Sequence, residues 1–121
     1  MSVVSKTIKY LLDKNISVST AESCTGGLLA AEFTAVSGIS KIYKTGLITY
    51  SNDSKIKNLK VKPSTIKRYG AVSRQVCAQM CLHLHKISKS QLTFSTTGVA
   101  CLLYTSPSPR DATLSRMPSS A

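Results

Sequence analysis

The segment AESCTGG at residues 21–27 constrains the fold of this chain more than any other feature. It follows a β-branched apolar run at 16–20 and precedes a Leu- and Ala-rich run at 28–34. A strand, a glycine turn and a helix in this order direct backbone N–H groups and hydroxyls toward a ligand above the turn. The pattern therefore predicts a strand-to-helix turn that attracts anions. Its plain alternative is a turn that only caps a helix.

Strand and helix patterns alternate along the first 100 residues. Spacing and capping residues predict helices at 6–14, 25–34, 52–59 and 74–88, a helical turn from Pro63 to Gly70, and strands at 16–20, 46–50 and 91–96. A turn at 37–40 leads into a short helical or irregular piece that carries Ile42 and Tyr43. This alternation is typical of a layered α/β sheet.

The composition changes after residue 100. Residues 101–121 hold three of the four prolines and five serines, without a sustained period. Such a composition is typical of a flexible tail, and the segment also resembles translated adapter or vector sequence. We therefore expect one domain at 1–100 and an unstructured, non-native tail at 101–121.

The formal net charge of +11 is high for 121 residues. The densest basic cluster, at 55–68, has no interleaved aromatic residues, so nucleic acid is not expected to be the main partner. The charge also suits an anionic small molecule. No apolar run is long enough to span a membrane, and no secretory signal is visible, so we expect a cytoplasmic protein without a membrane partner.

Cys77, Cys81 and His85 share one face of the expected helix at 74–88. Three ligands along one helical stripe rarely converge on one ion, and apolar residues recur beside them at helical spacing. We interpret this face as buried, and we expect neither a metal nor a cofactor.

Four further segments follow the turn in a fixed order: SGIS at 37–40, TYSNDSK at 49–55, YGAVS at 69–73 and STTGVA at 95–100. Together with AESCTGG they closely resemble the C-terminal domain of the CinA family, over residues 5–100. The resemblance implies a three-layer α/β/α fold with a small central mixed sheet. Stand-alone members of that family are nicotinamide mononucleotide deamidases. They hydrolyse this nucleotide to nicotinate mononucleotide and ammonia without a metal.

The family pattern continues after residue 100 with Gly-Pro, a glycine-rich loop, further strands and a closing helix, whereas this sequence diverges there. We therefore expect a fold that is incomplete at the C-terminus and a 121-residue form that is inactive. The chain begins just before the first expected helix, which favours the stand-alone amidase form.

Amide hydrolysis needs a nucleophile, a group that moves its proton and donors for the oxyanion. Ser40, Tyr50 and Lys55 match the positions of the family's proposed catalytic group. A lysine acts as a base only when its pKa is lowered, which requires burial or nearby positive charge. The resemblance thus implies that Lys55 accepts the proton of Ser40, directly or through Tyr50.

The AESCTGG turn is the expected substrate-binding element, through Ser23, Thr25, Gly26 and Gly27. Ser23 is also a rival nucleophile, because small residues at strand-to-helix turns serve as nucleophiles in other hydrolases. The alternative function is a non-catalytic nucleotide or nucleic-acid binding module, which the charge favours. A small-molecule nucleotide is the expected partner, and a homo-oligomer is compatible with the sequence.

Overall fold

A four-stranded sheet in the order β2-β1-β3-β4 forms the centre of the molecule. The computed structural model describes residues 2–98 and 113–117. Strands β1 (Val18–Glu22), β2 (Tyr43–Ile48) and β3 (Leu92–Thr97) run parallel, and β4 (Thr113–Met117) runs antiparallel to β3. The small mixed sheet expected from the resemblance is thus confirmed.

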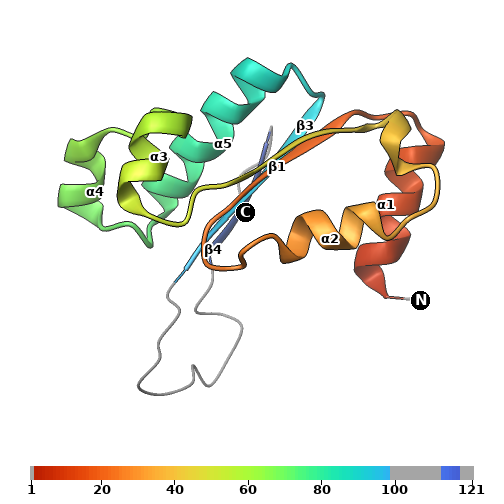
Figure 1. Cartoon of the computed structure of the whole chain (residues 1–121), viewed down its shortest axis with the longest axis horizontal. Helices are drawn as coiled ribbons and strands as arrows, with labels where there is room; N and C mark the ends of the chain where they lie inside the picture. The colour runs from red at the N-terminus through yellow and green to blue at the C-terminus, as the bar shows by residue number, and fades with distance from the viewer. Residues whose placement is uncertain (1, 99–112, 118–121) are drawn as a thin grey trace.

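Helices cover both faces of this sheet. They are α1 (Val3–Asp13), α2 (Leu28–Thr34), the 3₁₀ helix η1 (Ile39–Lys41), α3 (Asn52–Leu59), α4 (Pro63–Tyr69) and α5 (Arg74–Ser88). Figure 1 shows α1 and α2 on one side of the sheet, and α3, α4 and α5 on the other. This arrangement is the predicted three-layer α/β/α architecture. No helix in the described part of the chain is long and apolar enough to cross a bilayer.

Strand β1 is the central element, and all five of its residues are buried. Successive side chains of a strand point to opposite faces, so β1 contributes to two separate apolar clusters. Val18 packs in the cluster beneath α1 and α2, which includes Ile8 and Phe33. Ala21 packs in the cluster on the opposite face, which includes Leu59, Val61, Val76, Met80 and Leu84. Both faces of the sheet are therefore closed by helices over β1.

Local capping signals predicted the limits of α3 and α5 correctly. Ser51 accepts a hydrogen bond from the N–H of Ser54, and Ser73 accepts one from the N–H of Val76. Cys77 and Cys81 lie on the buried face of α5, as the apolar spacing indicated. Strong N-caps fix helix starts through short-range contacts, which is why the sequence sufficed here.

The strands begin and end at other residues than predicted. In β1, Ala21 pairs with Leu47 and Glu22 with Ile48, so the strand ends two residues later than the expected 20. Strand β2 begins at Tyr43, inside the piece expected to be helical or irregular. Pairing with a neighbouring strand set these limits, and such pairing is invisible in a local window. The turn proper is therefore shorter, at residues 23–27.

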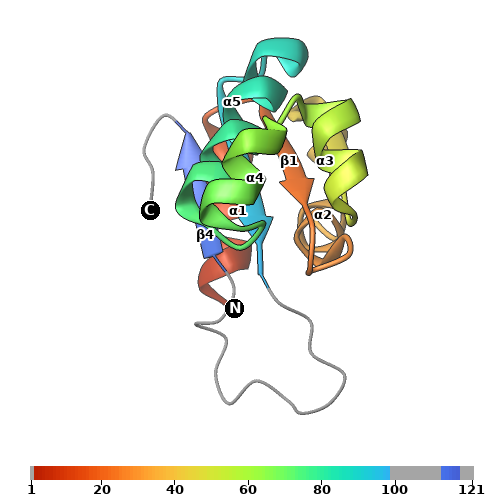
Figure 2. The same cartoon turned by 90° about the vertical axis from the view of Figure 1, so that its left-hand side faces the viewer.

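The expectation of an unstructured tail is wrong for five of its residues. Thr113–Met117 form β4, with Thr97 opposite Thr113 and Thr93 opposite Met117. Figure 2 shows β4 at the edge of the sheet, beside β3. An added strand satisfies backbone groups that a free β3 edge would leave unpaired, and this explains the pairing despite the weak local pattern. The rest of the predicted tail lies outside the described residues, and its non-native origin stays a prediction.

Candidate active site

A pocket of about 150 Å³ lies where the carboxyl ends of the three parallel strands meet. Its lining residues follow β1, β2 and β3 or belong to the neighbouring helical layer: Ser23, Cys24, Tyr50, Asn52, Lys55, Ala71, Thr97 and Gly98. Ligands of α/β sheets bind at this edge, because loops from several strands converge there. The pocket is therefore the candidate active site.

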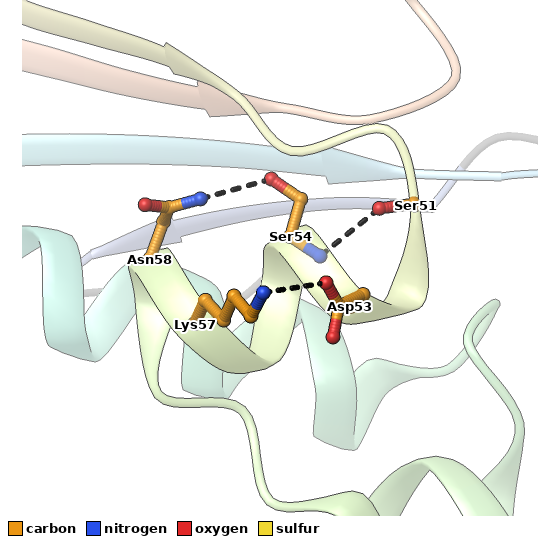
Figure 3. A network of polar contacts seen from close by, with 5 residues as sticks. All are labelled: Ser51, Asp53, Ser54, Lys57 and Asn58. Carbon is orange, nitrogen blue, oxygen red and sulfur yellow. Dashed lines mark hydrogen bonds and ion pairs between the residues drawn. The ribbon is translucent and has the colours of Figure 1, made fainter.

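Helix α3 places Lys55 in this pocket. Ser51 caps the helix, while Asp53 and Lys57 form an ion pair of 3.2 Å on its exposed face (Figure 3). Lys55 lies on the opposite face with a side chain only 2% exposed. The short cap-defined helix thus separates a solvent-facing lysine at 57 from a buried one at 55.

The Lys55 amine is held by a single backbone contact among the described residues. Its Nζ donates a hydrogen bond of 3.1 Å to the carbonyl oxygen of Tyr50. No carboxylate of the described chain forms an ion pair with it. Burial lowers the pKa of Lys55 below its ordinary 10.5, and a nearby negative charge on Cys24 would oppose this shift. Lys55 consequently has an increased neutral fraction, as a proton acceptor requires.

Cys24 lies beside Ser23 in the same pocket. Burial raises the pKa of its thiol above 9.0, although the backbone N–H groups of Cys24 and Thr25 and the charge of Lys55 act in the opposite direction. At neutral pH the sulfur is therefore protonated and a poor nucleophile. The Ser23 hydroxyl and the Cys24 thiol are thus the two nucleophilic groups of the turn that line the pocket.

The anion-binding position expected at the start of α2 is occupied by a carboxylate of the protein itself. The buried carboxylate of Glu22 accepts hydrogen bonds from the N–H groups of Leu29 and Ala30, at 2.7 and 2.9 Å. It also accepts one of 2.8 Å from the hydroxyl of Thr25. A carboxylate at this position satisfies the free N–H groups and the positive end of the helix. The prediction that this helix end attracts an external anion is therefore wrong.

The residues expected to bind substrate fare differently. Ser23 lines the pocket. The Thr25 hydroxyl instead donates a hydrogen bond to the Glu22 carboxylate, and its oxygen lies 3.0 Å from the hydroxyl oxygen of Thr96. Gly26 and Gly27 adopt positive φ angles of 63° and 109°. A Cβ at Gly27 would lie 3.1 Å from Ile48, so glycine there permits the turn to pass close to β2. Thr25 and Gly27 thus shape the turn, and Thr25, Gly26 and Gly27 are not among the residues that line the pocket.

The structure does not bring Ser40 to Tyr50 and Lys55. Ser40 is exposed and belongs to η1, which precedes β2, whereas Tyr50 follows β2. Six strand residues span about 20 Å, so Ser40 and the pocket lie at opposite ends of the sheet. The expected convergence of the three residues therefore fails, because a strand separates positions that are only ten residues apart.

A Glu22→Gln substitution should lower the free energy of unfolding by about 2–3 kcal/mol, since charge-assisted bonds to buried N–H groups are lost. Urea denaturation of the 121-residue chain measures this effect. Glu32→Gln, on the exposed face of α2, is the control with the same chemical change and should alter stability by less than about 0.5 kcal/mol. Equal transition midpoints for the two variants would contradict the role assigned to Glu22.

The family model of the CinA C-terminal domain matches residues 1–103. The chain belongs to the CinA family. It is 51% identical over 92 residues to a putative competence-damage inducible protein of Clostridium novyi, and 47% identical over 92 residues to one of Acetivibrio thermocellus. Each match covers 76% of this chain and 22% of the relative, so the chain spans about a fifth of the length of these curated relatives.

Solved structures of the CinA superfamily share the fold. The competence/damage inducible protein of Agrobacterium tumefaciens is 31% identical, with a TM-score of 0.81 over 96% of this chain and 76% of that one. The competence or damage-inducible protein of Enterobacter asburiae is 25% identical, with a TM-score of 0.80 over 96% of this chain and 77% of that one. The α/β fold of this CinA-family chain is thus established.

Besides Cys24 of the turn, sequence reasoning missed four residues that line the pocket of this CinA-family domain: Asn52, Ala71, Thr97 and Gly98. Each lies within a segment that carried the family resemblance, in TYSNDSK, YGAVS or STTGVA. The signal was that all three segments follow or end a structural element, since such positions gather at one edge of a parallel sheet.

Proposed function

We propose that the pocket hydrolyses the carboxamide of nicotinamide mononucleotide, yielding nicotinate mononucleotide and ammonia. Family membership supports the reaction class, through the resemblance to stand-alone CinA-type deamidases. The observation that carries the proposal is the buried Lys55 amine, with its lowered pKa, in the same pocket as the Ser23 hydroxyl. The hydroxyl can serve as the nucleophile and the partly neutral amine as its general base, and this combination needs no metal.

We assign the nucleophile to Ser23 in place of Ser40. Neutral Lys55 accepts the Ser23 proton while Oγ attacks the amide carbonyl, which forms the C–O bond of a tetrahedral intermediate. Its collapse breaks the C–N bond, and ammonia leaves with the proton returned by Lys55. A water molecule then attacks the resulting ester, gives its proton to Lys55 and releases the carboxylate. Lys55 then returns this proton to the Oγ of Ser23, which restores the hydroxyl.

The turn that carries Ser23 also offers donors for the oxyanion. The backbone N–H groups of Cys24 and Thr25 act on the Cys24 sulfur and lower the pKa of its thiol, and in the proposed mechanism they donate to the oxyanion. Two N–H groups next to a nucleophile stabilise the negative charge that develops on the attacked oxygen. In this mechanism Tyr50 positions Lys55 through its carbonyl oxygen, and its side chain, 62% exposed, borders the mouth of the pocket.

The decisive assay compares two proteins. One is the 121-residue chain, and the other, the extended chimera, joins residues 1–100 to the segment that follows the matched region in the Clostridium novyi relative. Both are incubated with nicotinamide mononucleotide, and ammonia and nicotinate mononucleotide are quantified. Product from the extended chimera supports the function, and product from the 121-residue chain contradicts its expected inactivity. Tight binding without product in either protein would favour the nucleotide-binding module instead.

The pH profile should report Lys55. Its folded-state pKa lies below 10.5, and only the neutral amine accepts a proton. The kcat/KM of the extended chimera should therefore rise with pH, reach half of its maximum at a pH below 10.5, and then level off. Steady-state rates across buffers of constant ionic strength measure this. A rate that stays flat, or that falls as pH rises through this range, would exclude a neutral lysine as the base.

A further inference from the structure

A second hollow, of about 300 Å³, lies on the outer surface of the helical layer formed by α3, α4 and α5. Its lining residues come from α5 and from the link between α3 and α4: Lys60, Lys62, Gln79, Leu82, His83 and Lys86. We call this surface the basic hollow. Residues 79, 82, 83 and 86 form one stripe along α5, because they are spaced by three or four positions. None of the lining residues belongs to the candidate active site.

Hydrogen bonds hold the backbone of the basic hollow in place. The N–H of Lys62 donates to the side-chain oxygen of Gln79 at 2.9 Å, and the Gln79 amide donates to the Thr65 hydroxyl at 2.8 Å. Val61, between the two lysines of the link, is 1% exposed and anchors it in the core. Lys60, the residue after α3, has a positive φ of 53°. The link is therefore fixed against α5, while Lys60, Lys62 and Lys86 stay exposed.

The charges of the basic hollow are uncompensated within the described residues. Three lysines and His83 line it, and no aspartate or glutamate does. On α3, the carboxylate of Asp53 is already paired with Lys57 (Figure 3). Like charges gathered on a fixed surface raise its free energy, and an anion bound between them lowers it. The arrangement therefore favours a ligand with several negative charges in close succession.

We propose that the basic hollow binds a chain of two or more linked phosphate groups, either free inorganic oligophosphate or the phosphate chain of a nucleoside polyphosphate. Its three lysines offer several positive charges to the successive phosphates of such a chain. Single-stranded nucleic acid fits less well, because its binding relies on large aromatic side chains for base stacking, and the described lining residues include no Phe, Tyr or Trp. Leu82, 51% exposed, offers an apolar contact for a nucleoside. This site does not depend on the proposed amidase function.

Isothermal titration of the 121-residue chain with tripolyphosphate and with a nucleoside triphosphate tests the proposal. The Lys62→Glu/Lys86→Glu double variant should bind tripolyphosphate at least about tenfold more weakly than the parent chain, and parental affinity should fall as salt rises. The control, Lys9→Glu/Lys41→Glu, makes the same net charge change at exposed lysines of α1 and η1, and should alter affinity by less than about twofold. Circular dichroism verifies folding, and Lys62→Gln/Lys86→Gln replaces any variant that unfolds.

The two ligands distinguish the source of the phosphate chain. Equal affinities show that the phosphates alone are recognised, whereas tighter binding of the nucleoside triphosphate adds a role for Leu82, and both results support the site. Equal losses in the two double variants would overturn it, since net charge alone would then explain binding. Binding of a short oligothymidylate without binding of tripolyphosphate would also overturn it, in favour of nucleic acid.

Discussion

The Ser23→Ala substitution is expected to lower kcat of the extended chimera for nicotinamide mononucleotide by about a thousandfold or more. The hydroxyl is the only group at this position that can form the ester, and loss of a nucleophile removes covalent catalysis altogether. Binding should persist, because the walls formed by Cys24, Tyr50 and Thr97 are unchanged. Ammonia release measures the rate, and titration with the substrate measures binding.

Ser40→Ala is the matched control, because it removes the same atom from a serine at the opposite edge of the sheet. It should leave kcat within about twofold, because Ser40 is exposed in η1 and distant from the pocket. If Ser40→Ala instead abolished activity while Ser23→Ala preserved it, the family's proposed position would be the nucleophile. Cys24→Ala completes the set, since loss of activity in this variant alone would assign the reaction to the thiol.

Lys55→Met should change activity and stability in opposite directions. Turnover should fall by at least about a hundredfold, because no other described residue of the pocket combines burial with a lowered amine pKa. The thermal midpoint at neutral pH should rise by about 4 °C, as methionine fills a similar volume without the cost of burying a charge. Calorimetry of the 121-residue chain measures the second effect.

The stability gain from Lys55→Met should depend on pH in a defined direction. The folded-state pKa of Lys55 is lower than its unfolded value of 10.5. At pH values between these two pKa values, the folded chain therefore binds fewer protons than the unfolded chain. The cost of burying the ammonium is complete below the folded pKa and disappears as pH rises to 10.5. The gain should therefore shrink as pH rises. Lys57→Met, at the exposed ion pair, should change the midpoint by less than about 2 °C, and a destabilised Lys55→Met would contradict the argument.

The contrast between α3 and β2 shows which element limits can be predicted from neighbouring residues alone. Helix α3 begins after Ser51 because one side-chain oxygen accepts the N–H of Ser54, a contact within three residues. Strand β2 begins at Tyr43 because it pairs with Val18, 25 positions earlier in the chain. A cap is written in neighbouring residues, whereas a strand limit depends on a distant partner.

The candidate site divides in the same way. The sequence singled out Ser23 and Lys55, and the structure places both in one pocket. It also suggested Ser40, because this residue of SGIS matches the position of a serine in the family's proposed catalytic group. The direction of β2 between them decides that only the second segment reaches the carboxyl edge of the sheet. Likewise, only the folded chain shows that the Glu22 carboxylate occupies the start of α2.

By itself, the sequence determined the family, the α/β class and the limits of α3 and α5, because these depend on residue types at short spacing. The tertiary structure alone decided the strand limits, the pairing of β4 and which of Ser23 and Ser40 lies in the pocket. These depend on which backbone groups meet across the sheet, and hydrogen bonding between strands joins residues that no local pattern connects.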